Sequence, residues 1–370
     1  MPRKVLHVIP SLYIGGAEAV LVRLLERWRL QDRYEISVCT LVEGGSFAPA
    51  VRHLGVPLYS VGIAGRFDVR AIPRLRALFH TLRPDIVHAN LLYADVYTAL
   101  ATRGAQRPRM VYTEHSTWTR RRASSIFRPF DIFVMRAYDR IIAVCEVARQ
   151  RLIAWAGVDP AITVTIPNGI DLNQFSTSSN RKAIRERLNV GEDDFLIVNV
   201  GRLTRRKGVH RLLEAAHALK TAGRRFRLWI IGDGEQRQTL EAQCRRLYMT
   251  DVVQFLGARR DVSELLPAAD LFVTPSLTEA MPMAVLEAMA SAVPVVATRV
   301  GGIPEAVRDG IEGSLVPADD ALALGRAIHQ YMDMSPEDRR AVGQRGRLRV
   351  AEEYNIDITS QRILRVYDEL

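Results

Sequence analysis

Residues 5–28 are VLHVIPSLYIGGAEAVLVRLLERW, a short apolar run followed by a stretch with helical periodicity. The apolar run is rich in β-branched residues, which is typical of a buried strand. In the later part, apolar side chains recur on one helical face, at Val20, Leu21, Leu24, Leu25 and Trp28. A strand followed by an amphipathic helix is the unit from which parallel sheets covered by helices are built.

The same alternation runs through the chain in two series. The β-rich runs of the first series lie at 5–10, 34–41, 56–61, 85–90, 110–115, 140–145 and 162–167. Those of the second series lie at 195–201, 226–234, 252–257, 271–276, 293–298 and 313–318. Between the two series, PNGIDLNQFSTSSN (167–180) is typical of a linker. The end of the chain is predicted to be helical, with a break at Tyr354 and Asn355.

We therefore predict an α/β fold of two Rossmann-like, doubly wound domains that face each other. The N-terminal domain would span 1–168 and the C-terminal domain 169–355. In such sheets ligands bind at the carboxyl ends of the strands, so we expect the site in the cleft between the domains.

Composition excludes several classes of protein. A chain of 370 residues with 48% hydrophobic residues is globular and longer than one core usually fills. It has no run of 18 apolar residues and no long apolar segment near its start, so neither a membrane span nor a signal peptide is expected. Its three cysteines form no CxxC motif, which indicates a reducing, cytoplasmic location.

The positive charge lies in one half of the chain. Residues 1–170 contain 23 Lys and Arg against 13 Asp and Glu, whereas the remainder is balanced. This asymmetry suggests an anionic ligand or surface on the first half, although solvated arginines explain it as well. The hypothesis of a nucleic-acid-binding protein would rest on this charge alone, because the sequence shows neither a recognition helix nor strands with aromatic faces. Nucleic acid is therefore not an expected partner.

Two loops that follow predicted strands have the residues of an anion site. Gly15 and Gly16 precede a helix, whose first N–H groups can meet an anion, although a tight turn explains them equally well. After the strand at 195–201, Arg202 and Lys207 lie in GRLTRRKG (201–208). A guanidinium and an ammonium group at a strand-to-helix turn suit a diphosphate; the alternative is a solvated basic turn.

Two glutamates lie in an otherwise apolar stretch, TEAMPMAVLEAM (278–289). Pro282 suits the first turn of a helix, which places Glu279 in the preceding loop and Glu287 about a turn inside. Eight helical steps rise roughly 12 Å, too far for the carboxylate pair of a glycosidase, which is about 5–10 Å apart. The spacing suits two hydroxyl-bearing groups on either side of a diphosphate, as in a sugar nucleotide.

These motifs resemble those of the retaining glycosyltransferases of the GT-B fold, family GT4. TEAMPMAVLEAMA (278–290) is similar to their E-x7-E signature and GRLTRRKG to GRL-x3-KG. IPNGID (166–171), GGIPEAVRDGIEGSLVP (301–317) and IGGAE (14–18) resemble further segments of the family in the same order. Two segments depart from the family pattern: Ala-Met-Pro replaces Gly-Phe-Gly after the first glutamate, and Cys145 replaces a common serine.

The resemblance implies a role for each matched residue of the second half. Glu279 would contact the hydroxyls and the reacting face of the donor sugar, and Glu287 would hold the ribose. Arg202 and Lys207 would bind the diphosphate. The backbone around the start of the helix would assist them, at Met281, Pro282 and Met283.

In the first half, the resemblance implies that Gly15 and Gly16 close over the phosphate or the acceptor. His115, in YTEHS, lies where the family places a histidine near the donor sugar, so Glu279 and His115 are the predicted catalytic residues. His88, also at a strand end, is expected to be structural. The helix 356–370 would pack back on the N-terminal domain.

The implied reaction transfers a hexosyl group from a UDP- or GDP-sugar to an acceptor hydroxyl with retention of configuration, in polysaccharide or glycolipid synthesis. No metal or other cofactor is expected, because the chain contains no D-x-D motif. A sugar-nucleotide epimerase of the same fold remains an alternative, as does a non-catalytic basic binding protein. A double displacement with Glu279 as nucleophile is the less favoured mechanism.

Acceptors in this family are frequently lipid-linked glycans at the cytoplasmic face of a membrane. STWTRRRASSIFRPFDIFVMRAYDR (116–140) combines Arg120–Arg122 and Arg128 with bulky apolar residues. Cations beside apolar side chains suit a helix that lies on an anionic membrane, although an ordinary amphipathic helix is an equal alternative. Peripheral membrane association is therefore a hypothesis.

Overall fold

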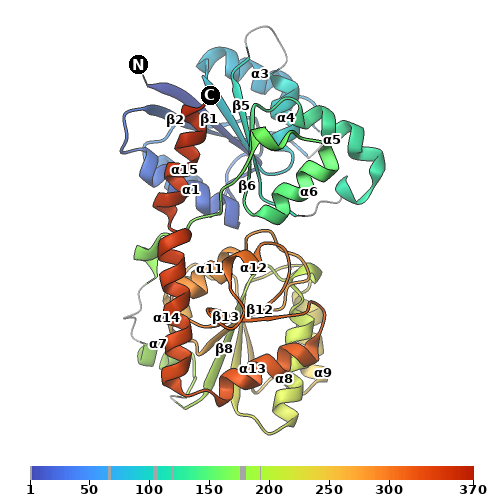
Figure 1. The fold of residues 1–370 in the computed structure, drawn as a ribbon, viewed down its shortest axis with the longest axis vertical. Coiled ribbons are helices and arrows are strands. Elements are labelled where there is room, and N and C mark those ends of the chain that lie inside the picture. Colours follow the sequence, from blue (N-terminus) through green and yellow to red (C-terminus); the bar gives the residue numbers. More distant parts are fainter. Residues whose placement is uncertain (1, 66–67, 103–106, 118–120, 176–180, 192) are drawn as a thin grey trace. The chain divides into compact units, whose positions relative to one another are not determined.

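The computed structural model describes all residues except 1, 66–67, 103–106, 118–120, 176–180 and 192. The chain forms two compact units, one of Met1–Gly169 with Ile356–Leu370 and one of Ile170–Asn355 (Figure 1). The first division lies one residue after the position that we placed at 168 from the sequence. No helix in the described parts of the chain is long and apolar enough to cross a membrane.

The first unit is built on a parallel sheet that has seven strands among the described residues, in the order β3-β2-β1-β4-β5-β6-β7. Every β-rich run predicted for this half forms a strand. Their bounds are β1 (Arg3–Ile9), β2 (Tyr34–Thr40), β3 (Leu58–Ser60), β4 (Ile86–Asn90), β5 (Arg109–Glu114), β6 (Arg140–Ala143) and β7 (Thr163–Thr165). The order of strands reverses between β1 and β4, so the loops after these two strands diverge at the carboxyl edge.

Helices cover both faces of this sheet, which explains why β4 is buried along its whole length. The helices are α1 (Gly16–Trp28), α2 (Ala48–His53), α3 (Ala71–Leu82), α4 (Ala94–Ala101), α5 (Arg128–Met135), α6 (Glu146–Ala156) and α15 (Ile356–Asp368). On α1, all five apolar positions that we predicted from the periodicity are buried. The last helix, α15, lies beside α1 (Figure 1).

The second unit repeats the plan with a parallel sheet of six strands among the described residues, in the order β10-β9-β8-β11-β12-β13. The strands are β8 (Phe195–Val200), β9 (Phe226–Ile231), β10 (Val253–Gly257), β11 (Leu271–Thr274), β12 (Val295–Thr298) and β13 (Gly313–Val316). The helices are α7 (Arg181–Arg187), α8 (Val209–Thr221), α9 (Arg237–Arg246), α10 (Val262–Leu265), α11 (Met283–Ala290), α12 (Ile303–Ala306), α13 (Ala321–Asp333) and α14 (Pro336–Glu353).

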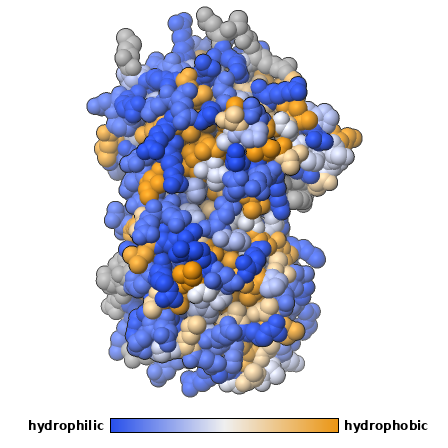
Figure 2. Space-filling model, in the orientation of Figure 1, coloured by the Kyte–Doolittle hydropathy of each residue, from blue (hydrophilic) through white to orange (hydrophobic). Residues whose placement is uncertain are grey.

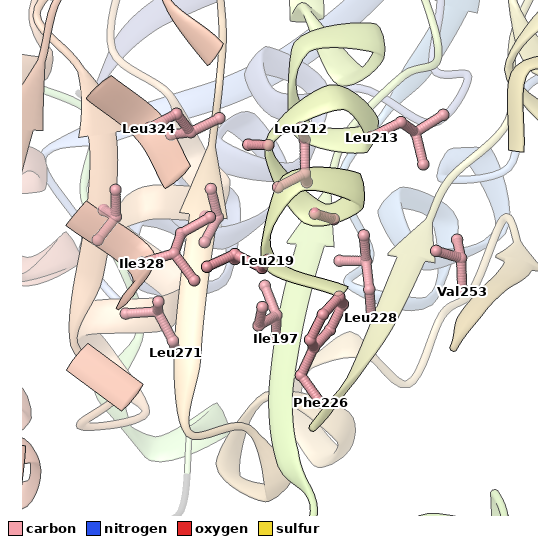
Figure 3. Close-up of a cluster of buried hydrophobic side chains, with 14 of the residues drawn as sticks. Ile197, Leu212, Leu213, Leu219, Phe226, Leu228, Val253, Leu271, Leu324 and Ile328 are labelled. Carbon is pink, nitrogen blue, oxygen red and sulfur yellow. The ribbon is translucent and has the colours of Figure 1, made fainter. Parts of the chain in front are cut away.

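The core of the second unit lies between its sheet and helices α8 and α13. Figure 3 shows Leu212 and Leu219 of α8 on the side of Ile197 of β8, and Ile328 of α13 on the side of Leu271 of β11. These five side chains are buried, so each helix is held by its apolar face rather than by helix propensity. The sheet is therefore a rigid platform for the loops at its edge.

The final helical region is interrupted where the sequence predicted a break. Helix α14 ends at Glu353 and α15 begins at Ile356. In the second unit, the amide of Ile170 donates to the carbonyl of Tyr354 over 2.7 Å, so the chain enters and leaves this unit at neighbouring points. The C-terminal helix α15 then belongs to the first unit.

Candidate active site

The loop after β8 forms the basic side of the site in the second unit. Residues 205–207 make one turn of 3-10 helix, and Gly208 then starts α8 with a φ of +65°. A Cβ atom at Gly208 would lie 2.0 Å from the carbonyl oxygen of Pro275, so only glycine lets this loop approach the end of β11. The amide of Leu277 donates to the carbonyl of Arg206 over 2.7 Å and joins the two loops.

The structure brings the predicted diphosphate lysine and the predicted sugar-binding glutamate into direct contact. Lys207 Nζ lies 2.5 Å from Glu279 Oε1, and Ser276 Oγ donates to the same oxygen over 2.7 Å. The Glu279 side chain is 10% exposed and that of Lys207 30% exposed. A partly dehydrated ion pair of this kind is stronger than a surface pair, because water screens it less. Arg202 is exposed, and its guanidinium makes no hydrogen bond or ion pair with any described residue.

Glu287 lies one turn inside α11, as the sequence predicted. It is half-buried, and burial raises the pKa of its carboxyl to about 7. Its carboxylate has no protein hydrogen-bond partner among the described residues. An acceptor that is kept partly dehydrated and unpaired suits a ligand with hydroxyl donors.

The start of α11 differs from the prediction by one position. Pro282 is the N-cap, with φ −76° and ψ 111°, and Met283 is the first helical residue. Proline lacks an N–H group, and the amides of Val285 and Leu286 donate to the carbonyl of Pro282, so Met283 and Ala284 supply the remaining amide donors of this helix end. Met281 and Pro282 are buried, which fixes the entry to the helix, and Glu279 lies before it.

A glycine pair after β12 supports the loop that carries Glu279. Gly301 has a φ of +55°, and a Cβ atom there would lie 1.9 Å from the carbonyl oxygen of Glu279. The amide of Gly302 donates to the carbonyl of Ala280 over 2.8 Å. This segment, which resembled a late family motif in the sequence, therefore acts as a backbone support for the glutamate loop.

The glycine pair of the first unit is at a helix start, as predicted, but a carboxylate is already there. Gly15 is the extended N-cap of α1, and a Cβ atom on it would lie 2.2 Å from Glu18 Oε2. Glu18 was not among the residues predicted from the sequence, although an acidic residue at the third helical position is a known signal of a capping interaction. An anion that binds at Gly15 and Gly16 would meet this carboxylate as well as the helix N-terminus.

His115 directly follows β5. Both of its ring nitrogens are buried and lack a hydrogen-bond partner among the described residues. Burial lowers the pKa of His115 to about 4, so the imidazole is neutral at neutral pH. The preceding residue, Glu114, pairs with Arg122, which turns inward and is 8% exposed.

The other buried groups add detail to two sequence observations. His88 is bonded to Tyr367 and Thr113, in keeping with a structural role. Cys145 is the N-cap of α6, and its side chain makes no capping hydrogen bond. No group of three metal-binding side chains occurs among the residues that the structure describes.

Comparison with known proteins identifies the family. Residues 14–174 match Glycosyltransferase Family 4, and residues 180–349 match Glycosyl transferases group 1. The putative glycosyltransferase EpsD of Bacillus subtilis is 31% identical over 285 residues, which are 74% of each chain. The chain belongs to the family 4 glycosyltransferases.

A second relative supports this glycosyltransferase assignment, and a solved structure supports the fold. The UDP-Gal:alpha-D-GlcNAc-diphosphoundecaprenol alpha-1,3-galactosyltransferase of Escherichia coli is 29% identical over 345 residues, 89% of this chain and 88% of the relative. The crystal structure of Anabaena Alr3699/HepE in complex with UDP and glucose has a TM-score of 0.88 at 24% identity and covers 100% of both chains. The predicted GT-B fold is confirmed, and the protein is an enzyme that transfers a glycosyl group.

Proposed function

We propose that this glycosyltransferase moves a hexosyl group from a UDP- or GDP-sugar to an acceptor hydroxyl with retention of configuration. The acceptor would be a glycan or lipid-linked glycan in polysaccharide or glycolipid synthesis. The observation that carries the proposal is the contact of Lys207 with Glu279 just before α11, with the unpaired Glu287 one turn inside that helix.

The three side chains match the three parts of a nucleotide-diphosphate sugar. Lys207, with the exposed Arg202 and the N-terminus of α11, would bind the diphosphate, where negative charge grows as it departs. Glu279 would then accept hydrogen bonds from the sugar hydroxyls instead of the ammonium group. Glu287 would accept those of the ribose.

The reaction breaks the bond between the anomeric carbon and the diphosphate oxygen. The acceptor oxygen forms its new bond on the same face, and its proton passes to the departing phosphate oxygen. We propose that no metal or other cofactor takes part, because the cations of the site would balance the leaving charge. His115, neutral through burial, would contact the donor sugar from the first unit.

The names of similar proteins support the choice of donor and acceptor. Alr3699/HepE is described in complexes with UDP, with UDP and glucose, and with UDP-glucose. The Escherichia coli relative is named for a UDP-galactose donor and a diphosphoundecaprenol acceptor. These names therefore favour a UDP-sugar over a GDP-sugar as the donor, and a lipid-diphosphate-linked glycan over a free glycan as the acceptor.

Thermal stabilisation by a panel of UDP, GDP, ADP and their sugars tests the donor. One nucleotide should raise the melting temperature, and Lys207→Ala and Glu287→Ala should both lose that increase. Lys220→Ala is the matched control, because it removes a lysine–carboxylate pair with Asp251 on another part of the same unit. If no nucleotide stabilises folded wild-type protein, the proposal is wrong.

The reaction itself is tested with the donor so identified and a synthetic lipid-diphosphate glycan. A new glycosidic bond with the anomeric configuration of the donor is expected in the product by NMR. Inversion of configuration would contradict the retaining mechanism. An isomerised nucleotide sugar without acceptor would instead support the epimerase alternative.

We also propose that the enzyme is cytoplasmic and binds an anionic membrane through the region of α5. Four large apolar side chains are exposed there: Ile126, Phe127, Phe130 and Phe133. Figure 2 shows hydrophobic atoms at the surface of the unit that holds α5. Arg128 and Arg136 are exposed beside them, and Asp131 is buried. Exposed apolar and cationic side chains without an exposed acid suit a negatively charged lipid surface.

The basic part of this surface is smaller than the sequence suggested. Arg122 pairs with Glu114 in the interior, and Arg120 and the side chain of Arg121 lie outside the described residues. Vesicles of neutral and of anionic lipid in a flotation assay test the proposal, with Phe130→Ser/Phe133→Ser as the variant and Tyr248→Ser, an 84% exposed tyrosine of the second unit, as the control. Wild-type protein that stays in the soluble fraction with anionic lipid contradicts it.

A further inference from the structure

Neighbouring strands of the first unit direct polar side chains at α1 and α15, where apolar ones would be expected. His7 on β1 is paired in register with His88 on β4, and their rings lie 4.8 Å apart. Both histidines and Tyr367 of α15 are buried. Buried polar groups stabilise a fold less than apolar packing does unless each is hydrogen-bonded. The hydrogen bonds of these three side chains therefore decide what their burial costs.

The polar groups form one continuous hydrogen-bonded chain. Tyr367 Oη lies 2.6 Å from His88 Nδ1 and 3.2 Å from His7 Nε2. His88 Nε2 lies 2.6 Å from Thr113 Oγ1. At the other end, Asn90 Nδ2 lies 3.3 Å from His7 Nδ1 and 3.2 Å from the carbonyl oxygen of His88.

The carbonyl of His88 gives this chain a single direction. A carbonyl oxygen only accepts, so the Asn90 atom that faces it is the amide nitrogen, which then also donates to His7 Nδ1. Burial lowers the pKa of His7 to about 3 and that of His88 well below its ordinary value, so each ring is neutral and carries one hydrogen. His7 must therefore carry its hydrogen on Nε2 and donate to Tyr367.

The remaining steps follow from the same count of hydrogens. Every hydrogen of these groups is used only if Tyr367 donates its hydrogen to His88 Nδ1 and His88 carries its own on Nε2 and donates it to Thr113. The hydroxyl hydrogen of Thr113 is left for an acceptor beyond the chain. The direction thus runs from Asn90 to Thr113.

The hydrogen-bonded chain ends at Thr113, and His115 lines the same cavity as Thr113. This cavity of about 20 Å³ is also lined by Asn168 and Thr359. Most of the other side chains that line it are apolar, and a cavity of this size has room for one water molecule. The two nitrogens of His115 have no hydrogen-bond partner among the described residues, although they are buried.

We propose that a water molecule in this cavity accepts the hydrogen bond of Thr113 and donates one to His115. We call this series of hydrogen bonds, from Asn90 to His115, the relay. Tyr367 is thereby a positioning residue for His115, because its hydroxyl joins His7 to His88 within the relay. The part of this inference that concerns catalysis rests on the proposed function of His115. The hydrogen-bond relay itself does not.

Histidine tautomers measured by ¹⁵N NMR of the full-length protein test the relay without substrate. We expect His7 and His88 to carry their hydrogen on Nε2, and His115 to show a single tautomer. Tyr367→Phe should shift the signals of all three rings, and Thr113→Val should shift those of His115 while His7 stays unchanged. Tyr354→Phe is the control, because it removes a buried hydroxyl that donates to Glu305 in the other unit.

Two results would overturn the relay: an Nδ1–H tautomer at His7 or His88, or His115 signals that neither variant moves. Since the Thr113 variant is nearly isosteric, it keeps the test open if the Tyr367 variant fails to fold. In the transfer assay, Tyr367→Phe should lower kcat roughly three- to tenfold, the value of one hydrogen bond, with the nucleotide-induced thermal shift unchanged. An unchanged kcat would contradict the positioning role, whereas NMR shifts without any transfer by wild-type protein would contradict only the proposed function.

Discussion

At the scale of single residues, the proposed ribose-binding residue Glu287 lowers the stability of the fold at neutral pH. Burial raises the pKa of its carboxyl from 4.5 to about 7, so the folded protein holds this proton more tightly than the unfolded chain does. The free energy of unfolding therefore loses a contribution as the pH rises from about 4.5 to 7, and the loss persists above pH 7. A ligand hydroxyl would offset it by donating to the ionised form.

This sign gives a prediction for Glu287→Gln, which keeps the shape and removes the charge. At pH 8 the variant should melt at a higher temperature than wild-type protein, and the difference should shrink toward pH 5. The nucleotide-induced shift at pH 8 should be smaller in the variant, because a charge-assisted hydrogen bond becomes a neutral one. Melting curves across this pH range check both effects, and a difference that does not vary with pH would show that Glu287 does not titrate there.

Some residues of the site were beyond prediction from the sequence. The motifs marked Glu279 and Lys207 separately, but their contact depends on where two loops 72 positions apart meet. Glu18 was missed because its motif was interpreted only through its glycines. Arg122 was taken for a surface cation, since one sequence does not show that Glu114 pairs with it inside.

At the scale of elements, prediction succeeded where one pattern repeats. Every predicted β-rich run forms a strand, because parallel strands that are covered on both faces are largely apolar and rich in β-branched residues. Helix ends were less certain, as Pro282 shows: it caps α11 instead of lying in its first turn. The support that Gly301 gives to the Glu279 loop is a tertiary contact and has no local signal.

The support of the Glu279 loop by Gly301 predicts that alanine has different effects at Gly301 and at Gly310, although both glycines have a positive φ. Gly301 and Gly310 have φ values of +55° and +77°, so alanine at either position costs about 1–2 kcal/mol of backbone strain. At Gly310 nothing lies within 4 Å of a new Cβ atom, whereas at Gly301 it would meet the carbonyl of Glu279 at 1.9 Å. Gly301→Ala should therefore lose most of the nucleotide-induced thermal shift, and Gly310→Ala should keep it. Equal shifts in the two variants would contradict a supporting role for Gly301.

At the scale of the whole molecule, the C-terminal helix α15 packs on the N-terminal elements of the first unit. Arg3 donates to the carbonyl of Tyr367 over 2.7 Å, and the ring of Tyr367 lies 6.3 Å from that of Trp28. The ion pair between Arg27 and Asp357 is largely exposed and contributes at most about 1 kcal/mol. Burial of the apolar face of α15 stabilises the first unit more than this ion pair does, because that face covers Trp28 and the polar strand face beneath it.

A variant truncated after Asn355, which lacks α15, tests how much the stability of each unit depends on this helix. Without α15, the first unit should unfold at a clearly lower temperature, with a red shift of tryptophan fluorescence as Trp28 meets water. The second unit keeps its whole core, and Arg202, Lys207 and Glu287 lie in it, whereas Gly15 and Gly16 lie in the first unit. Calorimetry should therefore show two transitions, of which a bound nucleotide raises only the upper one. Asp357→Ala serves as the control and should change neither transition by more than a few degrees. If the nucleotide shifted no transition of the shortened chain, nucleotide binding would require groups of the first unit, and the prediction that Arg202, Lys207 and Glu287 suffice for it would be wrong.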